Sequence, residues 1–206
     1  MDARQAARTL EVIRTLMERT CQYQLLTARA SLAAGILAGI GALAFLFLNP
    51  NDPAHFGFVW LIVFAGSVLS TCIGTVMRGR ERGEQIWSRQ ARAVVMALAP
   101  SLFAALVLTI YFFVRGEHLW LPGVWMLCYG QGALATSAYA PSPIRWLGVA
   151  ALLLGSVTLW LTWWLGPEWA VLMMGLVFGV GHTGLGTALL VIERRQSSLR
   201  IHRSVA

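Results

Sequence analysis

The sequence contains little charge and no lysine. Only 12% of its 206 residues are charged, whereas 57% are hydrophobic. A soluble domain carries roughly 25% charged residues, so this chain has too few to cover a water-soluble globule. Nine tryptophans agree with a lipid environment, because tryptophan favours the membrane–water interface. The composition therefore predicts a membrane protein.

Residue patterns that carry enzyme chemistry are also missing. Metalloprotease, nucleophile-elbow and P-loop motifs do not occur. The three cysteines, Cys21, Cys72 and Cys128, have neither C-x-x-C nor metal-site spacing. His182 is the only histidine within a long apolar segment, and a haem held by two histidines would need another. We therefore expect no enzymatic activity, no catalytic residues, no metal and no cofactor.

Long uncharged segments are what the sequence does contain. Five of them have 22 residues and one has 24. A helix of 22 residues is roughly 33 Å long, which matches a hydrocarbon core of about 30 Å. The segments are about twice as long as barrel strands and do not alternate in polarity. They predict an all-α, polytopic membrane protein with six transmembrane helices. The predicted spans are 30–51, 56–77, 93–114, 119–140, 146–167 and 169–192.

Shorter polar segments flank this predicted bundle of residues 29–192. In residues 1–28, Leu10, Ile13 and Met17 recur at helical spacing among charged residues. This pattern favours a short amphipathic helix lying on the cytoplasmic surface. The alternative, that the segment extends the first span, stays open. Residues 193–206 form a basic tail.

The arginines set the orientation of the predicted spans. With the N-terminus inside, fifteen of the sixteen arginines are cytoplasmic, and Arg115 alone is external. Basic residues remain on the cytoplasmic side, so both termini should be cytoplasmic. The external loops are then 49–55, 115–118 and 166–168, which places His118 outside. The net charge of +7 reflects topology, and we expect no nucleic-acid partner.

Basic groups beside a bilayer attract anionic lipids within a Debye length. The lipid bilayer is therefore the first expected partner, with anionic lipids at the arginine-rich cytoplasmic face. A second copy of the chain or another membrane protein is the other partner considered.

Four polar side chains fall near the middle of the predicted spans. They are Ser67, Tyr129, Gln131 and His182. Polar groups at this depth turn toward the bundle interior, because lipid cannot satisfy them. They could form a site for a substrate, an ion or a proton. The alternative, which we favour, is that they form interhelical hydrogen bonds, which contribute about 0.6 kcal/mol on average.

Two glycine pairs have the G-x-x-x-G spacing. Gly35 and Gly39 lie in the first predicted span, and Gly175 and Gly179 lie in the last. Small residues at this spacing let helix backbones approach closely. We interpret both pairs as helix-packing sites within the bundle, with a dimer seam as the alternative.

Several short segments resemble a family of proteins. They are Met17-Glu18-Arg19-Thr20 within Leu10–Gly35, Trp125–Gly130, Arg145-Trp146-Leu147-Gly148 and Gly179-Val180-Gly181-His182. In these the chain resembles uncharacterised small bacterial six-span integral membrane proteins. The resemblance implies a bacterial inner-membrane location and no particular activity. The favoured hypothesis is a non-enzymatic protein that acts through a partner or self-association. A channel or transporter for a small solute, using the midplane polar residues, is the alternative.

The arginine distribution makes a prediction about topology. Reporter fusions after residues 52, 85, 117, 143 and 206 should report outside, inside, outside, inside and inside. The reason is that fifteen arginines then lie on the cytoplasmic side. Paired phosphatase and fluorescent-protein fusions measure this directly. An external C-terminus would contradict the span count.

Overall fold

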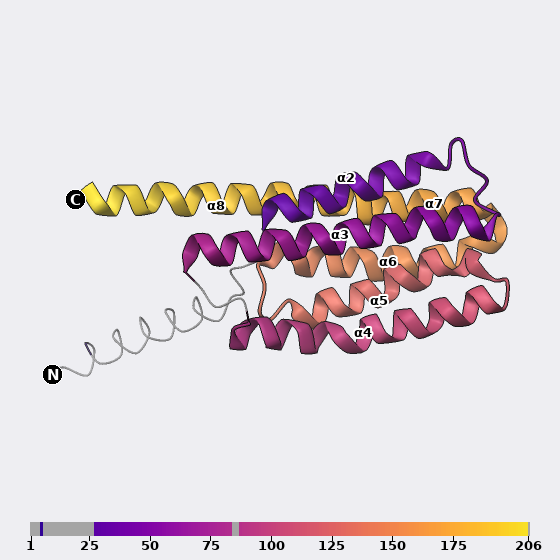
Figure 1. Ribbon diagram of the computed structural model, residues 1–206, viewed down its shortest axis with the longest axis horizontal. Coiled ribbons are helices and arrows are strands. Elements are labelled where there is room, and N and C mark those ends of the chain that lie inside the picture. Colours follow the sequence, from indigo (N-terminus) through magenta and orange to yellow (C-terminus); the bar gives the residue numbers. More distant parts are fainter. Residues whose placement is uncertain (1–4, 6–26, 84–86, 206) are drawn as a thin grey trace.

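The computed structural model describes residue 5, residues 27–83 and residues 87–205. These residues form helices joined by short turns, with no strand among them (Figure 1). The predicted all-α class is therefore confirmed. The predicted amphipathic helix over 1–28 lies almost entirely outside the described residues.

The helices follow the predicted spans in order. The elements are α2 (Ala28–Ala44), α3 (Pro53–Arg82), α4 (Arg89–Val114), η1 (His118–Trp120), α5 (Leu121–Thr136), α6 (Ser142–Leu165), α7 (Pro167–Met174), the π-helical turn η2 (Gly175–Val180) and α8 (Gly181–Val205). The 3-10 turn η1 directly precedes α5, and α7, η2 and α8 follow one another without interruption as one long helix.

Polar residues and glycines set the helix ends. The side chains of Thr27, Asp52 and Ser88 each accept a hydrogen bond from a backbone N–H two or three residues later. Such N-caps satisfy donors that have no partner inside the helix. Gly83 ends α3 at a φ of 64°, and Gly166 separates α6 from α7 at 84°. Glycine adopts these left-handed conformations without strain.

Among the described residues, four helical stretches are long and apolar enough to cross a membrane. They are Pro53–Glu81, Arg89–Val114, Ser142–Leu165 and Pro167–Arg195.

The helices α2 and α5 are shorter, with 17 and 16 residues, whereas a span needs about 20. The predicted first span extended to residue 51, but the α-helix ends at Ala44, where consecutive turns over residues 45–47 begin. At the other end of the chain, α8 continues to Val205. The basic tail is therefore helical through Val205, because no glycine or proline interrupts it after Gly186.

The helices pack side by side along one axis (Figure 1). α2 packs between α3 and the η2–α8 segment, while α5 packs between α4 and α6. A buried cluster of Ala38, Phe56, Trp60, Leu121 and Met174 joins α2, α3, α5 and α7. At the arginine-rich end, Arg78 of α3 pairs with Glu193 of α8.

The two G-x-x-x-G pairs meet at the contact between α2 and η2. A Cβ on Gly35 would lie 2.6 Å from the backbone nitrogen of Thr183 and 2.8 Å from the carbonyl oxygen of Gly179. A Cβ on Gly179 would lie 3.2 Å from the Cα of Gly39, and one on Gly175 would lie 2.7 Å from the Cβ of Ala42. The backbones of the two helices therefore touch where side chains are absent.

This contact generates a prediction with a matched control on the same helix. Gly35→Ala should destabilise the protein by about 1–3 kcal/mol, because the added methyl overpacks a backbone contact. Gly39→Ala adds the same methyl where no atom lies within 4 Å, so it should be neutral or stabilising. Unfolding titrations in mixed micelles measure both. Equal stabilities for the two variants would contradict the packing described.

Candidate functional site

The structure brings Tyr129 and His182 together inside the bundle. The hydroxyl oxygen of Tyr129 on α5 lies 3.0 Å from Nε2 of His182 on α8. Their ring centroids are 5.1 Å apart, and the Phe178 ring lies 5.4 Å from Tyr129 and 6.1 Å from His182. We call these three residues the Tyr129–His182 cluster. It connects three elements, α5, η2 and α8.

The second nitrogen of His182 is not fully satisfied. Nδ1 is buried and has no partner with hydrogen-bond geometry among the described residues. Whether the Tyr129 hydroxyl or Nε2 donates in their hydrogen bond depends on the imidazole tautomer. The cluster thus retains a buried ring nitrogen that makes no hydrogen bond within the described residues.

A π-helical turn positions His182. η2 covers Gly175–Val180, directly before Gly181 and His182. A π-helix adds a residue to one turn, and such insertions occur frequently at functional sites. Each added residue rotates the following helix face by roughly 100°, which determines the direction in which His182 points. Neither this turn nor Phe178 was predicted from the sequence. The glycines at 175, 179 and 181 were the only local signal.

Ser67 does not join the cluster. Its hydroxyl donates to the carbonyl oxygen of Val63, one turn earlier on α3, over 2.7 Å. Ser70 and Thr71 both donate to the carbonyl of Ser67 in the same way. These three hydroxyls of α3 therefore bond within their own helix.

Gln131 also lies apart from His182. It follows Tyr129 by two residues, which in an α-helix turns the side chain by roughly 200° to the opposite face. Gln131 is exposed, and the described residues provide no hydrogen-bond partner for its amide. The two predicted midplane residues on α5 thus face opposite sides of that helix.

The neighbours of Gln131 place it between α4 and α6. A Cβ on Gly130 would lie 2.8 Å from Cγ of Leu152 on α6, and one on Gly132 would lie 3.4 Å from the Cβ of Ser101 on α4. Leu152 and Ser101 are near the middle of their helices. Gln131 therefore lies at mid-height on the outer surface of the bundle.

His118, which was predicted to lie in an external loop, is a buried residue of η1. It is 3% exposed, and its Nε2 lies 3.3 Å from the carbonyl oxygen of Pro50. Its ring centroid is 5.5 Å from that of Phe56 and 6.2 Å from that of Phe113. The turn containing Pro50 covers the imidazole, which explains why a residue between two helices is not at the surface.

No metal site is evident in the described part of the chain. No group of three or more histidine, cysteine, aspartate or glutamate side chains gathers there. Cys72 is exposed on α3 and Cys128 is buried on α5, both as free thiols. Cys21 lies outside the described residues.

Comparison of the chain with protein-family models, with curated proteins and with solved structures finds no match. Function is therefore inferred from the residues of this chain.

The hydrogen bond between Tyr129 and His182 generates a prediction. Tyr129→Phe leaves Nε2 buried without its hydrogen-bond partner, which should cost about 1–3 kcal/mol of unfolding free energy. Tyr139→Phe is the control, because Tyr139 is 38% exposed. A double-mutant cycle with His182→Leu isolates the pairwise term. Additive effects of the two substitutions would show that the bond does not form.

Proposed function

We propose that the protein is a non-enzymatic integral protein of the bacterial inner membrane that acts by self-association. In this proposal it crosses the bilayer six times, and both termini are cytoplasmic. The four long apolar helices support the membrane location. The shorter α2 and α5 complete six spans, since the η1 turn precedes α5 and further turns follow α2.

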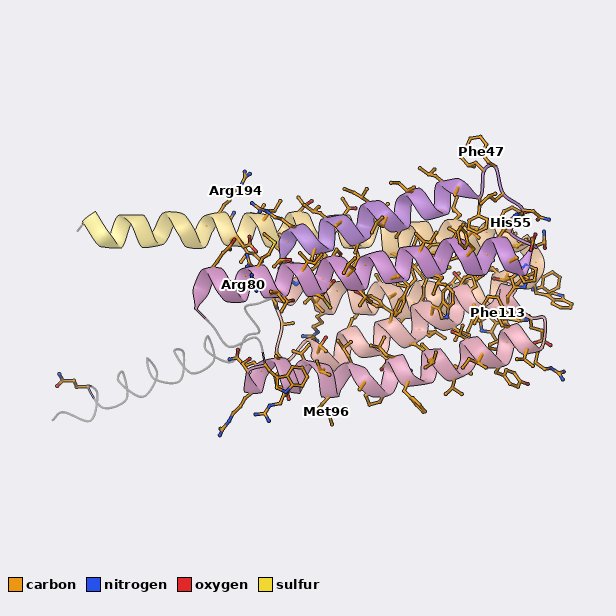
Figure 2. The ribbon with its side chains drawn as sticks, viewed as in Figure 1. Phe47, His55, Arg80, Met96, Phe113 and Arg194 are labelled. Carbon is orange, nitrogen blue, oxygen red and sulfur yellow. The ribbon has the colours of Figure 1, made fainter. Side chains whose placement is uncertain are left out.

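The distribution of side chains supports this orientation. Figure 2 shows Arg80 and Arg194 toward one end of the bundle, and Phe47, His55 and Phe113 toward the other. Arginines concentrate on the cytoplasmic side of membrane proteins. The end with Arg80 and Arg194 is therefore assigned to the cytoplasm.

The exposure of the Gln131 side chain is the observation that supports self-association. It lies at mid-height on the bundle surface, where the proposed topology puts hydrocarbon. Burying an amide without a hydrogen bond costs roughly 2–7 kcal/mol, and lipid tails offer no partner. A protein surface with a complementary polar group at the same depth removes that cost.

A second copy of the chain provides such a group. Copies in one membrane share their orientation, so a two-fold axis along the membrane normal places equivalent residues at equal depth. A glutamine amide carries both a donor and an acceptor, and two Gln131 side chains can therefore bond reciprocally. Ala135, one turn further along α5, is also exposed, and its small side chain permits close approach.

A channel or transporter is the second candidate function. The incompletely satisfied Nδ1 of His182, next to a π-helical turn, supports it. In that case the Tyr129–His182 cluster would bind the transported solute or proton. Solute flux into reconstituted vesicles that is lost in His182→Gln, with Gln131→Leu unaffected, would favour this function over self-association.

Self-association predicts a crosslink at Ala135. In a variant whose native cysteines are replaced, Ala135→Cys in vesicles should be joined to a second copy by a bifunctional thiol reagent. Adding Gln131→Leu should reduce the crosslinked fraction several-fold, since an interhelical polar bond contributes about 1–2 kcal/mol in model peptides. Leu69→Cys is the matched control, because Leu69 is 60% exposed at mid-height on α3. Equal crosslinking at both positions would contradict the proposed interface.

A further inference from the structure

A groove runs along the outer surface between α2 and the η2–α8 segment. It has a volume of about 790 Å³ and is open along its side. Its lining consists of aliphatic side chains, glycines and threonines. Residues that represent both helices are Ile36, Ile40, Gly39, Val180, Gly184 and Val191.

The threonines that line the groove offer no free hydroxyl proton. Thr183 donates to the carbonyl of Gly179 and Thr187 donates to the carbonyl of Thr183, each over 2.8 Å. Both protons are used within α8 and η2. The chemistry of the groove therefore suits a hydrocarbon chain.

Two glycines, Gly39 and Gly184, leave space in the groove. A Cβ on Gly39 or on Gly184 would meet no atom within 4 Å. In contrast, Gly35, Gly175 and Gly179 each face atoms of the partner helix. The missing side chains at positions 39 and 184 thus create space that nothing in the described protein fills.

Basic residues lie at one end of the groove. Arg29 is seven residues before Ile36, which is two turns along the same face of α2. Arg194 is three residues after Val191 on the groove face of α8. Both arginines are exposed, and Figure 2 shows Arg194 extending from α8 near the start of α2. Glu193 beside it is paired with Arg78.

The helix register brings the two arginines within reach of one anion. Contacts of Gly35 with Thr183 and of Gly186 with Leu32 fix an antiparallel register. In this register Arg29 is level with Leu189, so Arg194 lies five residues further along, or roughly 7.5 Å. Because Cβ atoms tilt toward a helix's N-terminus, the two side chains converge. Guanidinium groups bind phosphate through paired N–H donors.

The groove is long enough for an acyl chain from one leaflet. From Val191 to Gly175 it follows sixteen residues of helix, or roughly 24 Å, and half of the hydrocarbon core is about 15 Å. A chain whose headgroup lies at the arginines would therefore fit within the length of the groove. The groove can hold a lipid of the leaflet on the arginine-rich side.

A second copy of the chain fits this groove less well. Copies related by a two-fold axis along the membrane normal would bring Arg29 and Arg194 of each close to those of the other. Like charges placed together across an interface oppose association. An anionic lipid neutralises the same arginines.

We propose that the groove between α2 and α8 binds one acyl chain of an anionic phospholipid from the cytoplasmic leaflet, whose phosphate is held by Arg29 and Arg194. This site rests on the proposed membrane topology, and it is distinct from the Gln131 face, which lies between α4 and α6.

Native mass spectrometry of protein from vesicles of phosphatidylglycerol and phosphatidylcholine tests the site. The wild type should retain one phosphatidylglycerol in preference to phosphatidylcholine. Gly184→Leu should lose it, because the leucine fills the groove where there is room for it. Arg29→Gln with Arg194→Gln should lower the preference about 25-fold, at about 1 kcal/mol, or fivefold, for each arginine.

Matched controls separate the site from general effects. Ala99→Leu adds a similar bulk on the exposed face of α4, and Arg80→Gln with Arg92→Gln removes two exposed arginines from α3 and α4. These variants should retain the lipid as the wild type does. Equal retention in the groove variants and the controls would overturn the proposal. So would a loss of dimer mass in Gly184→Leu with lipid retention unchanged, which would assign the groove to a second copy.

Failure of this site and failure of the proposed function give different results. Should the lipid site be absent, crosslinking at Ala135 and the topology reporters would be unchanged. Should the topology be reversed, the reporters would place Arg29 and Arg194 outside the cell, whatever lipid is retained.

Discussion

The close approach of α2 to the η2–α8 segment determines most of this structure. Hydrocarbon tails are as apolar as leucine, so between helices in a bilayer the hydrophobic effect gives little attraction. Association then depends on surfaces that fit closely, and the backbone contact of Gly35 and Gly39 with Gly179 provides one. α3 packs in turn on α2, where a Cβ on Gly41 would lie 2.6 Å from Cγ2 of Val63. Nearby glycines on the same two helices leave the groove open.

The sequence was informative where local chemistry decides structure. Uncharged segments of 22 residues predicted helices, and capping residues such as Asp52 and Ser88 set their starts within a few residues of the predicted limits. The G-x-x-x-G spacing singled out glycines that the structure places at one helix contact. Counting residues from the span ends also gave a depth for His182 and Gln131. Depth follows from length alone, since a helix has a fixed rise.

The direction in which a side chain points was harder to predict than its depth along the helix. Tyr129 and Gln131 are two residues apart, yet only Tyr129 faces His182, because the packing of α5 against α4 and α6 decides which side is interior. The π-helical turn changes the face on which His182 lies, and no sequence motif marks it. His118 is buried because the turn at Pro50 folds over it, a tertiary contact between segments 68 residues apart. The positions of Tyr129 and His118 thus depend on neighbours that are distant in the sequence.

The polar side chains on the two faces of α5 differ in whether they have a hydrogen-bond partner. On the inner face, Tyr129 and His182 satisfy each other in part, so a hydrogen bond holds α5 against α8. On the outer face, Gln131 has no partner among the described residues, although leucine there would suit lipid better. If the amide served only to stabilise a single copy, it would have to bond within that copy, as Ser67 and Thr183 do through their own helices. Because it does not, we propose that its donor and acceptor bond to a second protein surface. Substitutions at Gln131 and at Tyr129 can therefore test association and internal packing separately, although both residues lie on α5.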